Sequence, residues 1–319
     1  MKNLLFVSML VLLGLFIGSS VHARTAIILA SFGTTVPEAV QAIDNINTRV
    51  KAAFPGVEVR MVFTSNIIRS VWEKRSHNPK EWKDLKISDE ILFTKNLLST
   101  FGDLNAQGFK DIIVQPTHVF HMEQYHDLMQ YVNAIRSIKT VRDKWKPFNK
   151  IALGRPALGT IGDRYPYPED LEEAVKALSS DIDLARQKKA ALVYMGHGNE
   201  LWSSGIYAEL QNRMRIIYPD VKTYVGCVEG YPGIEEVKNS LKHDRKNTGI
   251  LLKPLMIVAG DHAANDMAGE DGASWKNVLT KAGFKVETML QGLGSNNQFA
   301  DLFVDHIKDA ANDSGIDLK

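Results

Sequence analysis

The sequence predicts an α/β protein with two similar doubly wound, parallel-sheet domains that face each other across a cleft. Apolar runs of strand length alternate with amphipathic stretches of helical spacing from residue 25 onward. This alternation is typical of parallel sheets whose strands are joined by helices. Blocks of the first half also resemble blocks of the second half in the same order, which indicates two copies of one unit.

The N-terminal residues have the composition of an export signal. Lys2 provides a positive start, residues 4–17 are apolar, and Val21-His22-Ala23 offers small residues for cleavage. The apolar run is short and is followed by Gly18 and two serines, which does not favour a membrane span. We predict a signal peptide over residues 1–23, cleavage after Ala23, and an exported, periplasmic protein without a stable membrane span. A retained N-terminal anchor is the alternative.

Seven apolar runs are predicted to be strands, and the segments between them to be mostly helical. The first strand ends at a Phe32-Gly33-Thr34-Thr35 loop, and Pro37 suits the first turn of the helix that follows. The predicted strands span residues 25–31, 57–64, 111–117, 190–195, 221–228, 248–258 and 284–290.

The internal similarity and a break in the pattern divide the chain. LASFGTT aligns with VYMGHGN, VRMVFTSN with TYVGCVEG, and the segment around Pro116 with the one around Pro254. The run LGRPALGTIG interrupts the alternation. We predict an N-terminal α/β domain over 24–155 and a C-terminal α/β domain with a metal site over 156–296. Residues 297–319 are predicted to form a helix, capped by Asn297 and stopped by Gly315, that packs back across the junction.

Charge and cysteine content exclude several classes of protein. The 319 residues carry a formal net charge of +1 and no Lys/Arg-rich tract, so we expect no nucleic-acid partner. Cys227 is the sole cysteine, which excludes an intrachain disulfide. We predict it to be a buried, apolar thiol rather than a metal ligand.

Two histidines and a glutamate each follow a strand-like run of the second half. His197 lies in YMGHGN, Glu229 in GCVEGYP and His262 in VAGDHAANDM. Because the carboxyl ends of parallel strands meet in one crevice, we expect these side chains to converge. Such a set suits Co²⁺, Fe²⁺, Ni²⁺ or Zn²⁺ and leaves coordination positions open. The alternatives are a turn role for His197, a helix cap at His262 and a lysine partner for Glu229.

The first half carries a second group of candidates. The loop Gly33-Thr34-Thr35 joins a strand to a helix and so offers an anion-binding site. Ser65 and Arg69 follow the next strand, although Arg69 equally fits a surface charge. Three histidines follow the third strand, and the alternatives for each are metal binding, a place in the pocket wall and exposure to solvent: His118, His121 and His126. The remaining candidates, His77, His243 and His306, are expected to be solvated.

Long blocks of this chain resemble the anaerobic, class II cobaltochelatase family. They are LASFGTT, FTSNIIR, VQPTHVFHMEQY, MGHGNE, VEGYPGIEEV, LLKPLMIVAGDHAANDMAGEDGASWKNVL and LQGLGSNNQFADLFVDHI, and they cover nearly the whole chain after the signal. The resemblance implies a ferrochelatase-like fold and a lyase that inserts Co²⁺, or Fe²⁺, into sirohydrochlorin with release of two protons. It also implies that His197, Glu229 and His262 are the metal ligands and catalytic residues. Members of this family are usually cytoplasmic, so the export signal is a departure.

The resemblance gives the remaining candidates expected roles. The carboxylates of a tetrapyrrole need donors, for which we consider Gly33, Thr34, Thr35, Ser65, Arg69 and His118. His121 or His126 is a candidate ligand for haem or a second metal. The alternative function is an exported protein that binds or transports metal or haem on a chelatase scaffold. A homo-oligomer is compatible with the sequence and not required by it.

Overall fold

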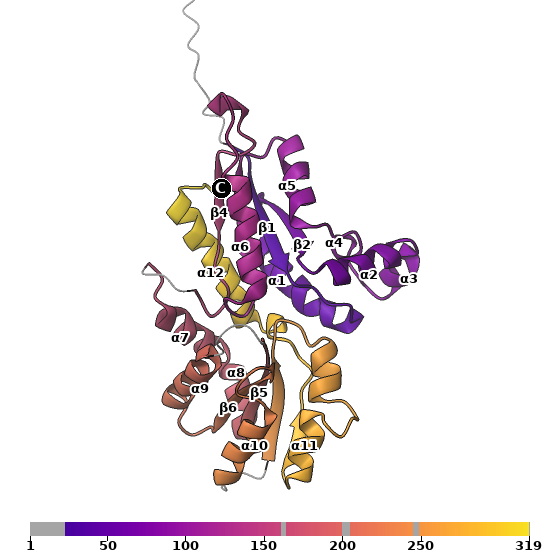
Figure 1. Cartoon of the computed structure of the whole chain (residues 1–319), viewed down its shortest axis with the longest axis vertical. Coiled ribbons are helices and arrows are strands. Elements are labelled where there is room, and N and C mark those ends of the chain that lie inside the picture. Colours follow the sequence, from indigo (N-terminus) through magenta and orange to yellow (C-terminus); the bar gives the residue numbers. More distant parts are fainter. Residues whose placement is uncertain (1–22, 161–163, 200–204, 245–248, 319) are drawn as a thin grey trace, which may run out of the picture.

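The protein forms two α/β lobes, one above the other in Figure 1, in a computed structural model that describes residues 23–160, 164–199, 205–244 and 249–318. The signal predicted for residues 1–23 therefore lies almost wholly outside the described residues. In the described ranges, no helix combines the length and the apolar character needed to cross a membrane.

The N-terminal lobe is built on a four-stranded parallel sheet in the order β2-β1-β3-β4. Its strands are β1 (Thr25–Ser31), β2 (Glu58–Phe63), β3 (Asp111–Pro116) and β4 (Lys150–Leu153). Its helices are α1 (Val40–Ala53), α2 (Asn66–Ser76), α3 (Pro79–Asp84), α4 (Asp89–Leu92), α5 (Leu97–Ala106) and α6 (Glu123–Arg136), with short 3₁₀ turns at Pro37–Ala39 and Asp143–Trp145.

The C-terminal lobe repeats this plan with the order β6-β5-β7-β8. Its strands are β5 (Ala191–Gly198), β6 (Thr223–Glu229), β7 (Gly249–Leu255) and β8 (Lys285–Thr288). Its helical elements are α7 (Tyr167–Ala177), α8 (Ser179–Lys188), α9 (Gly205–Ile217), α10 (Ile234–His243), η3 (Ala263–Met267, a π-helix), α11 (Trp275–Lys281), η4 (Leu293–Ser295) and α12 (Asn297–Ser314).

The two sheets confirm the predicted fold class. In both lobes the first strand lies at the centre and the third strand pairs with it, and Pro116 and Pro254 occupy matching places on the third strands, opposite Ala30 and Met195. Strand β4 was not predicted, because it is only four residues long and adjoins the Gly- and Pro-containing run that was assigned to the boundary.

Side chains that alternate along β1 bury both faces of the N-terminal sheet. Ile27 and Leu29 join the cluster that contains residues of α1 and α12, whereas Ile28 and Ala30 join the cluster that contains residues of α5 and α6. A sheet covered on both faces explains why its strands are continuous apolar runs rather than alternating ones.

Helix α12 returns from the C-terminal lobe and packs along the N-terminal one (Figure 1). It contacts α1, β3 and β4, and Arg49 of α1 forms a bidentate ion pair with Asp301. Its cap is Asn296 rather than the predicted Asn297, since the Asn296 side chain accepts hydrogen bonds from the amides of Gln298 and Phe299. Gly315 ends the helix in the left-handed conformation, as predicted.

Candidate active site

The three predicted metal ligands lie at the ends of neighbouring strands of the C-terminal sheet. His197 is next to last in β5, Glu229 ends β6, and His262 follows β7. The imidazole rings of His197 and His262 are 4.8 Å apart, edge to face. His197 Nδ1 lies 3.8 Å from Glu229 Oε2. The strand order β6-β5-β7 thus brings the three side chains together.

Hydrogen bonds at Nδ1 set the tautomers of both imidazoles. His197 Nδ1 lies 2.8 Å from the carbonyl oxygen of Gly198, and His262 Nδ1 lies 2.6 Å from Asp266 Oδ2. Both partners can only accept, so Nδ1 carries the proton and donates it. The Nε2 lone pair of each ring is therefore left for a metal, the arrangement found in many metal sites. His262 occupies the N-cap position of η3, but its side chain makes no capping hydrogen bond.

The three side chains form an open set. The exposed fractions are 41% for His197, 42% for Glu229 and 37% for His262, so a solute can reach all of them. No group of three or more His, Cys, Asp or Glu side chains in the described part of the chain is close enough to enclose a metal ion. Side-chain rotation is needed to bring both imidazoles and Glu229 onto one ion.

Gly198 makes the close approach of β5 and β6 possible. It lies opposite Glu229 and has a φ of +74°. A Cβ at this position would lie 1.8 Å from the Glu229 carbonyl oxygen. Only glycine therefore lets the chain turn directly after His197 while it remains against Glu229.

Cys227 is not part of this set. Its side chain is buried and its Sγ donates to the carbonyl oxygen of Pro232 at 3.3 Å. The prediction of a buried thiol is confirmed.

A cavity of about 580 Å³ between the lobes contains the three candidate ligands in its wall. The N-terminal lobe contributes residues that were predicted to bind substrate, namely Gly33, Thr34, Thr35, Ser65 and His118. It also contributes exposed apolar side chains that sequence reasoning did not single out. Phe32 is 43% exposed and Ile67 is 79% exposed. The C-terminal wall thus carries two imidazoles, and the N-terminal wall combines polar residues with exposed apolar side chains.

Several polar groups of the N-terminal wall already have partners inside the protein. The Thr34 hydroxyl accepts from the amide of Val36, and the Ser65 hydroxyl caps α2 by accepting from the amide of Ile68. Arg69 does not belong to the cavity wall, because its guanidinium donates to Asn66 on the same helix. No Lys or Arg is found among the described residues that line the cavity.

His118 is a neutral imidazole in the cavity wall. Burial lowers its pKa to about 4, and neither ring nitrogen has a hydrogen-bond partner in the described structure. Unpaired buried polar groups are destabilising unless a ligand or water satisfies them. His118 thus fits a role in ligand binding better than a purely structural one.

His121 and His126 lie outside the described cavity lining. Their rings are 6.4 Å apart and nearly parallel, and His121 packs edge to face on Tyr125. Burial and the neighbouring His126 lower the pKa of His121.

Two further residues support the site and were not recognised as such. Asp266 is four residues after His262, a spacing that puts both on one helical face and could have revealed it. The Tyr207 hydroxyl, which accepts from the Gly198 amide at 3.0 Å, holds the turn after His197. Four residues after the His197 loop were expected from the sequence to wall the pocket: Leu201, Trp202, Gly205 and Tyr207. Tyr207 lines the cavity, Gly205 does not, and Leu201 and Trp202 lie outside the described residues.

The hydrogen bond between Asp266 and His262 leads to a prediction for cobalt binding. We expect Asp266→Asn to weaken Co²⁺ binding by about 10- to 100-fold, because loss of the carboxylate removes the group that fixes the His262 tautomer. Calorimetric titration with Co²⁺ measures the effect. Asp220→Asn, which removes an exposed carboxylate paired with Arg186 and outside the described cavity lining, is the control. An unchanged affinity in Asp266→Asn would show that the hydrogen bond has no influence on the ligand.

Two parallel-sheet lobes around a cavity with an open His-Glu-His set define a metal-handling α/β protein. The family model described as cobalt chelatase (CbiK) matches residues 25–312, and the chain belongs to this family. It is 30% identical to the sirohydrochlorin cobaltochelatase of Salmonella typhimurium over 91% of this chain and 97% of that protein. It is 29% identical to the sirohydrochlorin cobaltochelatase CbiKC of Nitratidesulfovibrio vulgaris, over 89% of each chain.

Solved structures confirm the fold. SirB from Bacillus subtilis with Fe³⁺ superimposes with a TM-score of 0.60 at 15% identity, covering 93% of this chain and 100% of that one. The sirohydrochlorin chelatase SirB from Bacillus subtilis subspecies spizizenii in complex with cobalt gives a TM-score of 0.57 at 14% identity, covering 91% and 96%.

Proposed function

We propose that the protein is a sirohydrochlorin cobaltochelatase, a lyase that exchanges two pyrrole protons of a tetrapyrrole for Co²⁺. The observation that carries this proposal is the placement of His197, Glu229 and His262 on one wall of the interlobe cavity, opposite a wall that carries the exposed apolar side chains of Phe32 and Ile67. The relatives are chelatases, so the family supports an enzyme over the alternative of an exported metal- or haem-transport protein.

The metal is a substrate, and its three protein ligands suit transfer. The Nε2 atoms of His197 and His262 and the Glu229 carboxylate bind Co²⁺ and leave positions open for the pyrrole nitrogens. The Glu229 charge offsets part of the cost of partial desolvation of the dication. The two protons leave as the metal enters the ring, and a neutral imidazole released from the metal is a suitable acceptor near pH 7.

In this proposal the tetrapyrrole lies with one face on the exposed apolar side chains of the N-terminal wall. Phe32 and Ile67 provide contact surface for a flat macrocycle, and His118 provides an unpaired imidazole. The described lining contains the carboxylates Glu123, Glu229 and Asp261 but no basic side chain, so the substrate carboxylates point toward the rim. Gly33, Thr34, Thr35 and Ser65 are the donors proposed for these carboxylates, and Arg69 is absent from the described lining.

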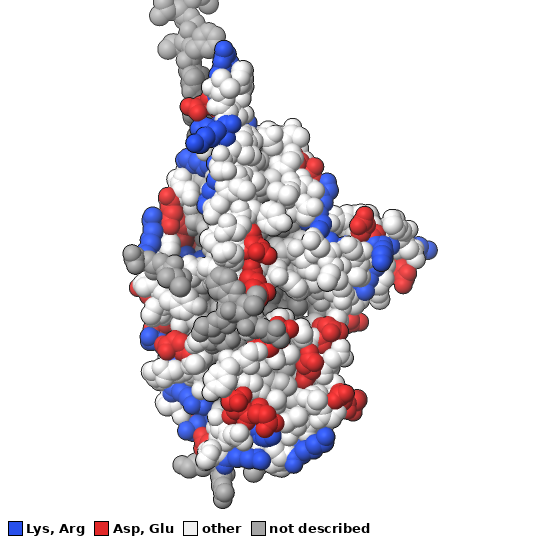
Figure 2. Space-filling view, in the orientation of Figure 1, with Lys and Arg blue, Asp and Glu red and all other residues white. Residues whose placement is uncertain are grey.

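Charge around the lobe junction also favours a cation. Asp and Glu residues are prominent at the level where the lobes meet in Figure 2, whereas Lys and Arg lie mostly toward the ends and edges. Such a distribution raises the local concentration of a dication.

Multiple turnover is the test of the enzymatic function. Purified protein is mixed with excess sirohydrochlorin and Co²⁺, and the absorbance change of the tetrapyrrole is followed. An enzyme converts many equivalents of substrate, whereas a carrier stops at one equivalent per chain. The same assay with Fe²⁺ determines whether iron is a second substrate.

Export is proposed for the chain because residues 1–23 have the pattern of a signal. We expect the mature protein to begin at Arg24 and to be recovered from the periplasm. N-terminal sequencing of the soluble protein measures this, and an intact Met1 there would contradict it.

We also propose that His121 or His126, which follow β3, binds haem or a second metal. We expect haemin to give a Soret band that is lost in His121→Ala or His126→Ala, because neutral imidazole is a common haem ligand. His77→Ala is the control. Absence of a specific haem spectrum, together with binding of a single Co²⁺, would remove the accessory site.

The domain limits and assembly complete the proposal. The lobes correspond to residues 24–155 and 156–296, with residues 297–319 as the helix that packs back across the junction. Light scattering of the purified protein determines whether it forms a homo-oligomer.

A further inference from the structure

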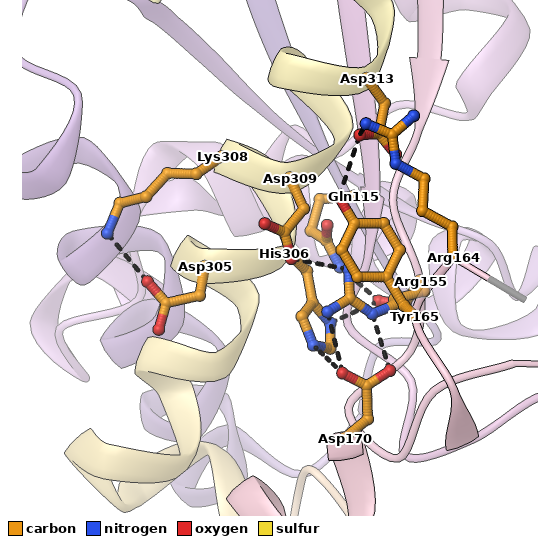
Figure 3. A network of polar contacts seen from close by, with 10 residues as sticks. All are labelled: Gln115, Arg155, Arg164, Tyr165, Asp170, Asp305, His306, Lys308, Asp309 and Asp313. Atoms are coloured by element: carbon orange, nitrogen blue, oxygen red, sulfur yellow. Dashed lines mark hydrogen bonds and ion pairs between the residues drawn. The ribbon is translucent and has the colours of Figure 1, made fainter. Parts of the chain in front are cut away.

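A buried polar network joins the two lobes at the segment that connects them. This connecting segment, residues 154–159, follows β4 and carries Arg155. Arg155 makes a bidentate ion pair with Asp170 of α7 at 2.7 and 2.8 Å and a third bond to Asp309 of α12 at 2.9 Å. His306 of α12 lies beside them, as Figure 3 shows. We call Arg155, Asp170, His306 and Asp309 the polar clamp.

The clamp is buried and its groups satisfy one another. The side chains of Arg155, Asp170 and His306 are 13%, 7% and 4% exposed. His306 Nδ1 donates to the Arg155 carbonyl oxygen at 3.0 Å, and its Nε2 lies 3.4 Å from Asp170 Oδ1. The expectation that His306 is solvated is therefore wrong. Its helical and partly polar sequence context gives no sign of its partners, the Arg155 carbonyl oxygen and the Asp170 carboxylate.

The clamp connects elements of different lobes. Asp170 lies on α7, which packs against α8 and α9 of the C-terminal lobe. Asp309 and His306 lie on α12, which packs against α1, β3 and β4 of the N-terminal lobe. Gly159 allows the segment to pass directly beside the clamp, since a Cβ there would lie 2.6 Å from Asp170 Oδ2.

The other side of the connecting segment supports the cavity wall. The Ala157 amide donates to the His118 carbonyl oxygen at 3.0 Å, and the Leu158 amide donates to the Val119 carbonyl oxygen at 2.7 Å. His118 and Val119 both line the interlobe cavity. The segment is thus held between the clamp on one side and the substrate wall on the other.

We propose that the polar clamp is a positioning device that fixes the His118–Val119 wall relative to the metal ligands of the C-terminal lobe. Arg155 and Asp170 act through the connecting segment and do not touch the substrate. The proposal deepens the chelatase function and rests on it for its kinetic consequence. Its structural consequence, order at residues 157 and 158, is independent of any activity.

Asp170→Asn tests the clamp, because it keeps the side-chain shape and removes the charge that pairs with Arg155. We expect hydrogen exchange at the Ala157 and Leu158 amides to rise at least about tenfold, since local opening becomes easier. We expect KM for sirohydrochlorin to rise by roughly fivefold or more with kcat reduced less than about twofold, because the wall shifts while the metal ligands stay in place. If the purified protein shows no turnover, the Kd for the metal-free tetrapyrrole, measured by absorbance, is compared between the variants instead of KM.

Two controls separate positioning from general stability. Asp181→Asn removes a buried ion pair with Lys253 that lies away from the connecting segment, and Asp220→Asn removes the exposed bidentate pair with Arg186. If Asp170→Asn does not fold, Asp309→Asn is tested in its place, because the Asp309 side chain is 32% exposed and its replacement disturbs the core less. Unchanged exchange at residues 157 and 158, an unchanged KM despite faster exchange, or an equal KM change in Asp181→Asn would each overturn the proposal.

Discussion

We expect replacement of His197 or His262 by alanine to lower cobalt insertion by more than about 100-fold, a larger effect than loss of the Asp266 carboxylate. Each imidazole keeps the Nε2 lone pair available for a metal because its Nδ1 donates to a hydrogen-bond acceptor. Removal of one imidazole leaves two protein ligands, which hold a dication weakly. The fold should be retained, since both side chains are more than one third exposed.

The steady-state rate of tetrapyrrole metallation and the Co²⁺ affinity together measure this prediction. His77→Ala and His243→Ala are controls, because neither residue lines the cavity. Circular dichroism confirms that the variants fold. Full turnover in both His197→Ala and His262→Ala would eliminate the proposed metal site, whereas a loss confined to one of them would reassign the other to substrate binding.

The fold was accessible to sequence reasoning because buried parallel strands are apolar throughout. The run at 25–31 coincides with β1, and the internal similarity anticipated two sheets of the same strand order. Strand β4 was missed because its four residues form too short an apolar run to indicate a strand. Its strand conformation is fixed by pairing with β3. The predicted cap of α12 was wrong by one residue, because Asn296 and Asn297 are adjacent and only the structure shows which side chain accepts the amide hydrogen bonds.

The sequence predicted those site residues that lie at the ends of strands. It did not predict the side chains whose positions depend on residues distant in sequence. His197 and Glu229 lie at the ends of β5 and β6 and His262 follows β7, so topology alone brings them together. Arg69 follows a strand as well, but its guanidinium turns to Asn66 on its own helix. The burial of His306 depends on Arg155 and Asp170, distant in sequence, and no local pattern reveals such partners.

Gly198→Ala is expected to have the second largest effect, on both stability and cobalt binding. Residues other than glycine in the left-handed region cost about 1–2 kcal/mol. At Gly198 a Cβ would also lie 1.8 Å from the Glu229 carbonyl oxygen and 2.7 Å from Cys227 Cβ. The clash is with backbone, so relief requires β5 and β6 to separate where His197 and Glu229 meet.

Gly56→Ala provides the matched control for this prediction, because Gly56 has a φ of +88° and no atom lies within 4 Å of a Cβ there. We expect Gly56→Ala to lower the free energy of unfolding by about 1–2 kcal/mol without affecting cobalt binding. Gly198→Ala should lower it by at least about 2 kcal/mol more, in the range of overpacked sites. Its Co²⁺ affinity should fall by more than roughly tenfold, since His197 and Glu229 no longer converge. Chemical denaturation and cobalt titration measure the two effects. If folded Gly198→Ala bound Co²⁺ as tightly as Gly56→Ala, the close approach of the two strands would not be what assembles the site.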